Sequence, residues 1–342
     1  MNYLPVSDET INHAAAILRN GGLVAFPTET VYGLGADAFN PQALAKVFEV
    51  KGRPHFDPLI IHIAALEMLE NVANLALLNG EIREKLFILA KNLWPGPLSV
   101  ILPKNEKIPG IATAGLDTAA IRFPDHDTAQ KLISLSTGAV AAPSANPFGA
   151  LSPTKAEHVR DKLGEKVDMI LDGGSTRIGL ESTVLDITGE HIKILRPGGT
   201  PKEAIERLIG SVEGAANGEC SNIDLPQSSP GLLKSHYAPK TALSVMNRED
   251  IVNQSYEKAC AFLFFDGKTR DEWLSAKKPA ETVNIKVLSE SGQVLEAASR
   301  LFETLHALDN CDILRIFAQF APLQGLGEAI NDRLRRASAG KD

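Results

Sequence analysis

Residues 21–35 read GGLVAFPTETVYGLG and place a cluster of polar side chains directly after a short apolar run. The run LVAF predicts a buried strand that begins at a glycine turn. Two threonines, a glutamate and a tyrosine follow before the next glycine. Threonine is common in strands and a Tyr-Gly pair often ends one, so the stretch fits a plain strand end as well as a ligand-binding loop.

Apolar periodicity around this stretch predicts a mixed α/β domain over residues 1–210. Helical spacing predicts helices near 8–19, 41–50, 64–74, 80–92, 126–135, 154–163 and 201–210. Short apolar runs predict strands at LVAF, PLIIHI, PLSVIL, TAAIRF, GAVAAP, DMILD, STVLDI and IKILR. The interleaving of helices with short apolar strands is typical of an α/β sheet covered by helices.

A segment without periodicity separates this domain from the rest of the chain. Residues 211–241 are rich in Gly, Ser, Asn and Pro, which predicts a linker. Residues 242–342 then resume the alternation, with strands at ALSVM, ACAFLFF, TVNIKVL and CDILRIFA and helices near 292–307 and 325–337. This pattern predicts a small, mostly parallel, three-layer α/β domain.

Composition narrows the class of protein. The chain has 342 residues, a net charge of -7 and three cysteines with no CxxC pair. Sparse, odd cysteines fit a reducing compartment, and we find no signal-peptide pattern at the N-terminus, so we expect a cytoplasmic protein. No apolar run approaches the roughly 18 residues of a membrane span, so we expect no membrane association.

The common catalytic motifs are missing from the sequence. It contains no GxxxxGK[ST] phosphate loop, no GxGxxG at a strand–helix junction, no HExxH and no GxSxG. The histidines show no paired ligand spacing, so we expect no metal held by the protein alone. Candidate site residues must therefore come from polar side chains next to the predicted strands.

Two cations follow the helix predicted near 41–50. Lys51 and Arg53 are two residues apart, and in an extended chain their side chains point the same way. Such a pair suits a phosphate or carboxylate clamp. The alternative is a solvated basic helix end that interacts with the helix dipole.

Charged groups also occur inside apolar strands. His62 lies in PLIIHI, where a lone histidine is more often a core residue than a ligand contact. Arg122 lies in TAAIRF, and a buried guanidinium requires an anion. The sequence leaves open whether that anion is a structural carboxylate or the carboxylate of a substrate.

The loop AAPSANPFGALSPT offers small hydrogen-bonding groups. Ser144 and Asn146 have the spacing of Lys51 and Arg53, and Ser152 follows. These side chains suit hydrogen bonds to a nucleotide, although Pro-rich loops also use Ser and Asn for ordinary turns. Ser182 in ESTV and Arg196 in ILRPGG complete the candidates.

Taken together, these motifs resemble the YrdC-type family of threonylcarbamoyl-AMP synthases. The motifs occur in the order FPTETVYGLG, KGRP, LWPGPLSVIL, AIRFPDH, APSAN, ESTV and ILRPGG, within residues 8–210. SPGLLKSHYAP and GLGEAINDRLRRA resemble the linker and C-terminal domain of the long, two-domain members. The resemblance implies a YrdC-like twisted mixed sheet over 1–210, a linker or lid over 211–241, and a Rossmann-like domain over 242–342.

The resemblance implies a reaction in which L-threonine, bicarbonate and ATP give threonylcarbamoyl-AMP and pyrophosphate. Mg²⁺ would be carried on the ATP phosphates, without protein ligands. The product would feed threonylcarbamoyladenosine modification of tRNA, with partner enzymes performing the transfer and with a tRNA contact as a further option. The missing nucleophile fits, because phosphoryl-type transfer needs alignment and charge neutralisation more than covalent catalysis.

The resemblance also assigns site residues. Catalytic roles fall on Lys51, Arg53, Ser144 and Asn146. Threonine contacts fall on Thr30, His62, Arg122 and Ser182, and the glycines of the first stretch would let backbone approach the ligand. ATP contacts fall on Arg53, Asp57, Thr118, Ser144, Ser152, Arg196 and Tyr237. In the linker, His236 and Tyr237 match the family better than Lys234, and Tyr237 is expected to cover the nucleotide as part of a lid.

Two other classes of function stay open from the sequence. An RNA-binding module contacting tRNA or double-stranded RNA would use a concave α/β surface, although the acidic net charge disfavours it. A carbamoyl transferase of hydrogenase maturation contains a similar domain. Those chains carry an acylphosphatase-like domain and CxxC zinc motifs, which this sequence lacks.

Overall fold

The computed structural model describes residues 2–214, 237–256, 259–279 and 283–339. They form two compact units. The first holds the chain up to Phe148, then Ser152–Arg177 and the described residues from Glu181 to Gly214. The second holds the described residues from Tyr237 onward, together with the short segments Gly149–Leu151 and Ile178–Leu180.

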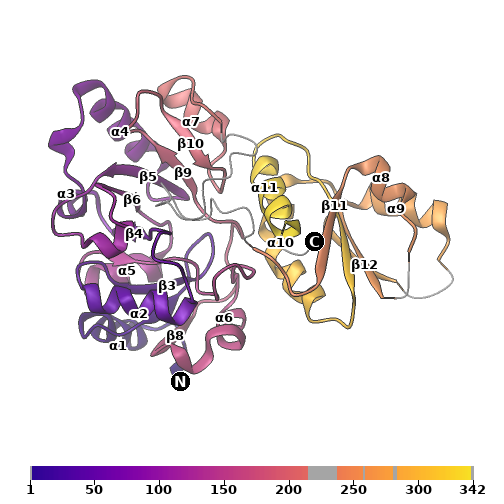
Figure 1. Ribbon diagram of the computed structural model, residues 1–342, viewed down its shortest axis with the longest axis horizontal. Coiled ribbons are helices and arrows are strands. Elements are labelled where there is room, and N and C mark those ends of the chain that lie inside the picture. The colour runs from indigo at the N-terminus through magenta and orange to yellow at the C-terminus, as the bar shows by residue number, and fades with distance from the viewer. Residues whose placement is uncertain (1, 215–236, 257–258, 280–282, 340–342) are drawn as a thin grey trace. The chain divides into compact units, whose positions relative to one another are not determined.

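A ten-stranded mixed sheet organises the first unit, in the order β1-β8-β2-β3-β7-β4-β6-β5-β9-β10 (Figure 1). The strands are β1 (Asn2–Pro5), β2 (Val24–Phe26), β3 (Gly33–Asp37), β4 (Ile60–His62), β5 (Leu98–Pro103), β6 (Thr118–Arg122), β7 (Val140–Ala141), β8 (Met169–Asp172), β9 (Thr183–Asp186) and β10 (Lys193–Arg196). Parallel pairs join β1 to β8, β8 to β2, β4 to β6 and β5 to β9, and the other neighbours are antiparallel.

Helices cover this sheet in two groups. The helices are α1 (Asp8–Arg19), α2 (Pro41–Lys51), α3 (Leu69–Val72), α4 (Gly80–Leu93), α5 (Asp127–Leu135), α6 (Ala156–Leu163) and α7 (Lys202–Ile209). Helices α1 and α5 pack with Val24 and Phe26 in one apolar cluster. Helices α2, α4, α6 and α7 contribute to a larger cluster that contains Ala25. Because side chains alternate along a strand, the two groups lie on opposite faces of the sheet.

Helix α2 shows how local sequence sets up the site. The Asn40 side chain accepts hydrogen bonds from the backbone of the first turn, and Pro41 occupies the first helical position. The helix ends at Lys51 because Gly52 adopts a left-handed conformation (φ 59°). The chain is therefore not extended between Lys51 and Arg53, and the expected i, i+2 geometry is wrong there.

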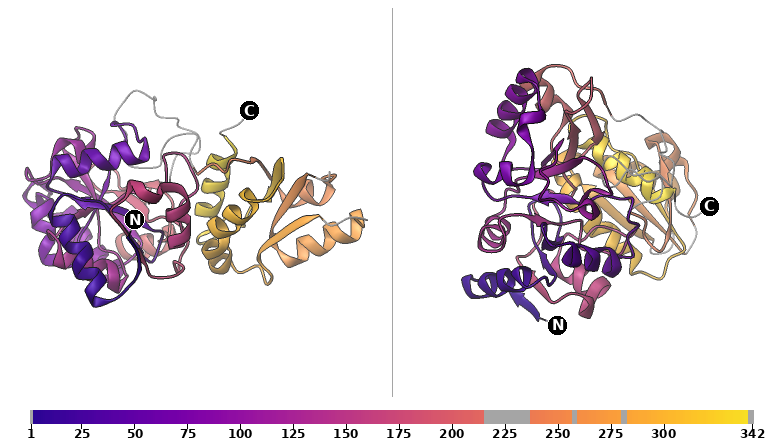
Figure 2. Two further views of the ribbon diagram at one scale, coloured as in Figure 1. Left: turned by 90° about the horizontal axis from the view of Figure 1, so that it is seen from below. Right: turned by 60° about the vertical axis from the view of Figure 1, so that its left-hand side comes forward.

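The second unit contains a four-stranded, all-parallel sheet in the order β11-β14-β12-β13. Its elements are β11 (Ala242–Met246), α8 (Arg248–Asn253), β12 (Cys260–Asp266), α9 (Gly267–Lys277), β13 (Asn284–Ser289), α10 (Val294–Asp309), β14 (Arg315–Gln319) and α11 (Gly327–Ser338). Helices α8 and α9 lie on one face of this sheet, and α10 and α11 lie on the other (Figures 1 and 2). The predicted fold class, a mixed α/β sheet followed by a small parallel α/β domain, is confirmed.

Strand β3 corrects the expectation for Gly35 of the first stretch. Residues 33–37 form a fully buried strand that pairs with β2. A Cβ on Gly35 would lie 2.8 Å from the ring of Phe26 and 2.9 Å from Val140. This glycine therefore makes room for core side chains, rather than for a ligand. The predicted helix at 64–74 is also broken into a short 3₁₀ turn and α3.

Candidate active site

Three neighbouring strands place polar side chains in one row. The register pairs His62 of β4 with Arg122 of β6, and Arg122 with Ser99 of β5. Directly paired residues project from the same face of a sheet, so the three side chains lie together. All three are buried. The row therefore puts a cation between an imidazole and a hydroxyl.

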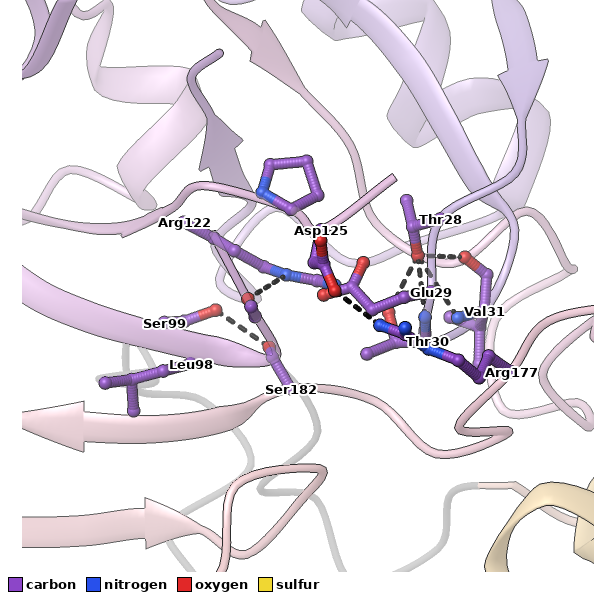
Figure 3. A network of polar contacts seen from close by, with 12 residues as sticks. Thr28, Glu29, Thr30, Val31, Leu98, Ser99, Arg122, Asp125, Arg177 and Ser182 are labelled. Carbon is purple, nitrogen blue, oxygen red and sulfur yellow. Dashed lines mark hydrogen bonds and ion pairs between the residues drawn. The ribbon is translucent and has the colours of Figure 1, made fainter. Parts of the chain in front are cut away.

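Arg122 has a protein carboxylate as its partner. Its Nη2 atom lies 2.6 Å from Oε1 of Glu29, and both side chains are at most 5% exposed. Its Nε atom donates a long hydrogen bond (3.4 Å) to the carbonyl oxygen of Gly96. Figure 3 shows Arg122 extending toward Glu29 from the sheet. Of the two anions left open by the sequence, the structure supplies the structural carboxylate.

His62 is an uncharged member of the row. Burial lowers the pKa of its imidazole to about 3, and the nearby Arg122 adds to this effect. Nδ1 lies 3.2 Å from the carbonyl oxygen of Ile60, and the ring makes an edge contact with Phe26. At neutral pH the imidazole therefore offers hydrogen bonds without a charge.

The loop after β2 presents two hydroxyls in a defined order (Figure 3). The Thr28 hydroxyl donates to the carbonyl oxygen of Val31 at 2.6 Å and lies 2.8 Å from the hydroxyl of Thr30. Because a hydroxyl has a single proton, the Thr30 hydroxyl must donate to Thr28. The Thr30 oxygen is then left with acceptor capacity only.

Ser182 connects the row to a second cation. Its hydroxyl lies 2.7 Å from that of Ser99, and Arg196 donates to both its carbonyl oxygen (2.9 Å) and its hydroxyl (3.2 Å). Arg196 is buried at the end of β10. The hydroxyl of Ser182 is therefore held between β5 and β10.

Lys51 forms hydrogen bonds with the loop that carries Ser144 and Asn146. Its Nζ atom donates to the carbonyl oxygens of both residues at 2.5 Å. Burial lowers the pKa of the ammonium well below its usual range, and Arg53 adds to the effect. Lys51 and Arg53 are only 3% and 6% exposed, so the solvated helix end considered from the sequence is wrong.

Arg53 is bonded to residues that follow it closely in the chain, Asp57 and Pro58. Its guanidinium donates to the carbonyl oxygens of Asp57 and Pro58, and it forms an ion pair with the Asp57 carboxylate at 3.0 Å. Burial raises the pKa of Asp57, while Arg53, Lys51 and Arg196 oppose that shift. The carboxylate of Asp57 is therefore close enough to Lys51, Arg53 and Arg196 to be stabilised by the charge of each.

No metal cluster and no membrane-spanning helix occur among the described residues. No three His, Cys, Asp or Glu side chains there are placed to hold a metal ion. No helix of the described ranges is long and apolar enough to span a bilayer.

Both halves of the chain match known protein families. Residues 16–198 match a family described as "Telomere recombination" that comprises Sua5, YciO and YrdC. Residues 200–339 match the family "Threonylcarbamoyl-AMP synthase, C-terminal domain". The chain is 43% identical to threonylcarbamoyl-AMP synthase of Pyrococcus abyssi, over 97% of this chain and 95% of that protein.

This chain belongs to the threonylcarbamoyl-AMP synthase family.

A further relative and a solved structure support the assignment. The threonylcarbamoyl-AMP synthase of Bacillus subtilis is 40% identical over 99% of this chain and 95% of its own length. The crystal structure of P. abyssi Sua5 complexed with L-threonine superimposes with a TM-score of 0.86, at 39% identity, covering 98% of this chain and 96% of that one. Members of this family are enzymes that form an AMP-linked product.

The remaining residues assigned through the family motifs lie in different places. Ser152 donates to Glu181, and both are buried in the first unit. Thr118 begins β6 and is half-buried. Tyr237 lies in the second unit, where its ring contacts Phe302 and the Arg333 guanidinium. Lys234, His236 and most of the predicted linker lie outside the described residues.

Three residues of the candidate site were not assigned from the sequence. They are Glu29, Ser99 and Glu181. Glu29 lies inside the stretch that first indicated a site, but its role depends on a pairing with β6 that is distant in sequence. Ser99 reads as part of an apolar strand, and only the register shows that it faces Arg122.

Proposed function

We propose that this chain converts L-threonine, bicarbonate and ATP into threonylcarbamoyl-AMP, pyrophosphate and water. The threonine nitrogen would attack the carbon of bicarbonate, and loss of water would give the carbamate. A carbamate oxygen would then attack the α-phosphorus of ATP, and the bond to the leaving pyrophosphate would break. This sequence needs positioning and charge neutralisation rather than a covalent enzyme intermediate.

The observation that carries the proposal is the buried Arg122–Glu29 pair beside three further polar groups. His62 and Ser99 are paired with Arg122 across the sheet, and Ser182 contacts Ser99. An amino acid with a hydroxyl group requires a site with both charges and with hydrogen-bonding partners for the hydroxyl. The similarity to P. abyssi Sua5, whose structure contains L-threonine, supports threonine as that amino acid.

The nucleotide would bind near the cations Lys51, Arg53 and Arg196, with Ser144, Asn146, Ser152, Asp57 and Thr118 as further contacts. Two observations support this part of the proposal. Each of the three cations is buried, and each donates to main-chain carbonyl oxygens, which fixes its position before a ligand arrives. Such preorganised positive charge is suited to stabilise the charge that develops on phosphate oxygens.

Mg²⁺ would enter this site on the ATP phosphates. Mg²⁺ keeps several water ligands and is often bound through one or two carboxylates together with substrate phosphates. Asp57 is the buried carboxylate among the cations, and Arg53 neutralises it. These residues fit a metal that is held mainly by phosphate. The metal would supply charge neutralisation at the leaving pyrophosphate.

The product would be passed to partner enzymes that modify adenosine in tRNA, in the cytoplasm. The name threonylcarbamoyl-AMP synthase, carried by the family of the C-terminal half and by the P. abyssi relative, supports the compound that would be passed on. We also propose that the chain contacts tRNA directly. The ring of Tyr237 would cover the bound nucleotide as part of a lid.

One assay tests the proposed reaction. Pyrophosphate release from ATP is measured with the complete mixture and with threonine or bicarbonate omitted in turn. Release that requires both substrates is the expected result. Release without threonine contradicts the proposal. Salt-sensitive tRNA binding with no pyrophosphate release would favour the RNA-binding alternative instead.

A further inference from the structure

Glu29 has acceptor capacity that the described protein does not use. Its side chain is 1% exposed. Neither carboxylate oxygen accepts a hydrogen bond from the residues that the structure describes, although Oε1 lies 2.6 Å from Arg122 Nη2. A buried carboxylate is normally surrounded by donors, because removing it from water costs several kcal/mol.

Arg122 has donor capacity in the same place. Nη2 makes the close ion pair but no hydrogen bond of good geometry within the described chain. The one hydrogen bond of this guanidinium there is the long contact from Nε to Gly96. The pair thus combines a donor-rich cation and an acceptor-rich anion side by side.

Thr30 adds a second acceptor next to the carboxylate. Its proton is engaged with Thr28, as the hydroxyl order in this loop requires. Glu29 and Thr30 are adjacent in the chain and buried. Two neighbouring acceptors without a donor between them suit an ammonium group, which carries three donors and no acceptor.

We propose that Glu29 binds the α-ammonium group of the substrate amino acid, while Arg122 binds its α-carboxylate. This inference rests on the proposed function and adds to it the residue that recognises the amine.

The geometry and the charge balance of the pair agree with this assignment. The two ionic groups of an amino acid share one α-carbon, so they lie side by side like Glu29 and Arg122. A zwitterion brings no net charge into a pair that is already neutral. Each buried charge would then have an opposite charge from the ligand and one from the protein, which reduces the cost of its burial.

A purely structural ion pair is the competing explanation. In that case Glu29 would only orient Arg122, and its loss would weaken every ligand that carries a carboxylate. If Glu29 contacts the ammonium, its loss weakens only ligands with an amine. The two roles can therefore be separated with a ligand that lacks the amine.

The experiment uses the full chain and calorimetric titration without ATP. The probes are L-threonine and β-hydroxybutyrate, which keeps the carboxylate and hydroxyl but has no amine. For the wild type we expect threonine to bind at least about tenfold tighter. For Glu29→Gln we expect threonine to weaken by about 10- to 100-fold, and β-hydroxybutyrate to change less than about threefold.

A matched control changes a carboxylate close by. Asp125 pairs with Arg177, and both side chains are partly exposed. Asp125→Asn should preserve the wild-type ratio of the two affinities. If Glu29→Gln does not fold, Glu29→Asp is used instead, because it keeps a carboxylate for Arg122 on a side chain shorter by one methylene group. We expect the same loss of preference for threonine over β-hydroxybutyrate.

Each remaining outcome has one meaning. Equal weakening of both ligands in the Glu29 variant assigns Glu29 to positioning Arg122 and overturns the inference. Equal affinities of the two ligands for the wild type overturn it as well. A wild-type chain that binds no threonine contradicts the proposed function itself.

Discussion

The hydroxyl oxygen of Ser99 lies 2.7 Å from the hydroxyl oxygen of Ser182, and both residues are buried. Ser99 belongs to β5, which pairs with β9 directly after Ser182. Ser99 also faces Arg122 across the sheet. Ser99 thus contacts one residue assigned to threonine binding, Ser182, and is paired in the sheet with another, Arg122, so we expect it to act as a positioning residue.

Ser99→Ala should impair threonine use without unfolding the chain. The substitution removes one buried hydrogen bond, so we expect about 1 kcal/mol of lost stability. The threonine KM should rise by about three- to tenfold, while the ATP KM stays within a factor of about two. Steady-state pyrophosphate release measures both constants. Equal changes in both would contradict a role specific to Ser182.

Asp57→Asn should destabilise the fold strongly. Asp57 forms a buried ion pair with Arg53, and its neutralisation removes the carboxylate that faces this guanidinium. Breaking a buried ion pair in this way costs about 3–5 kcal/mol. Urea denaturation followed by circular dichroism measures the loss.

The matched control is another pair with i, i+4 spacing. Glu81 and Lys85 are joined on α4, but Glu81 is exposed. Glu81→Gln should leave the denaturation midpoint unchanged, because surface ion pairs contribute little. If Asp57→Asn and Glu81→Gln lowered the unfolding free energy equally, burial would not determine how much an ion pair contributes to stability.

Gly35→Ala should overpack the first sheet. The added methyl group would meet the ring of Phe26 and the side chain of Val140 at less than 3 Å. Such overpacking costs about 1–3 kcal/mol. Gly80→Ala is the control, because a methyl group added there, at the start of α4, would meet no neighbouring atom of the described chain within 4 Å. A Gly35→Ala protein as stable as wild type would refute the proposed packing role.

His62 should make the fold sensitive to mild acid. Its pKa is lowered to about 3 in the folded state, against an ordinary value of 6.5. Above pH 6.5 the imidazole is neutral in both states. Between pH 6.5 and 3 the unfolded chain binds a proton that the folded chain does not, so stability falls as the pH falls. The slope from this residue is up to about 1.4 kcal/mol per pH unit.

Denaturation midpoints between about pH 4.5 and about pH 7.5 test this dependence. His62→Gln should flatten the pH profile of the unfolding free energy in this window. His13→Gln, at an exposed position of α1, serves as the control for the exchange itself. An unchanged profile in His62→Gln would assign the acid sensitivity to other groups.

Much of the fold was predictable because many elements carry their own periodicity. Helix α1 has apolar residues at helical spacing and begins at a Ser7–Thr10 capping box. Strand β3 was missed because two of its five residues are glycines, which disfavour strands. Helix α9 was missed because it lacks an apolar stripe, and Trp273 is its one large buried side chain.

The site was predictable as a set of residue types but not as a set of pairs. The buried Arg122 required an anion, and this requirement was correct. Its partner, Glu29, could not be identified, since the contact joins segments far apart in the chain. The sequence placed Lys51 on an extended loop, whereas the helix carries it up to the left-handed turn at Gly52, and its contact with the loop at Ser144 could not be foreseen.

The order of strands in the second unit has a consequence for synthesis on the ribosome. Strand β14, the last to be made, lies between β11 and β12. Within the described residues β11 has no other strand partner, so it must wait until β14 has left the ribosome. A nascent chain that stalls before Arg315 exposes unpaired edges of β11 and β12. Such edges promote aggregation, so the second unit carries this risk until β14 has been made and has paired with both strands.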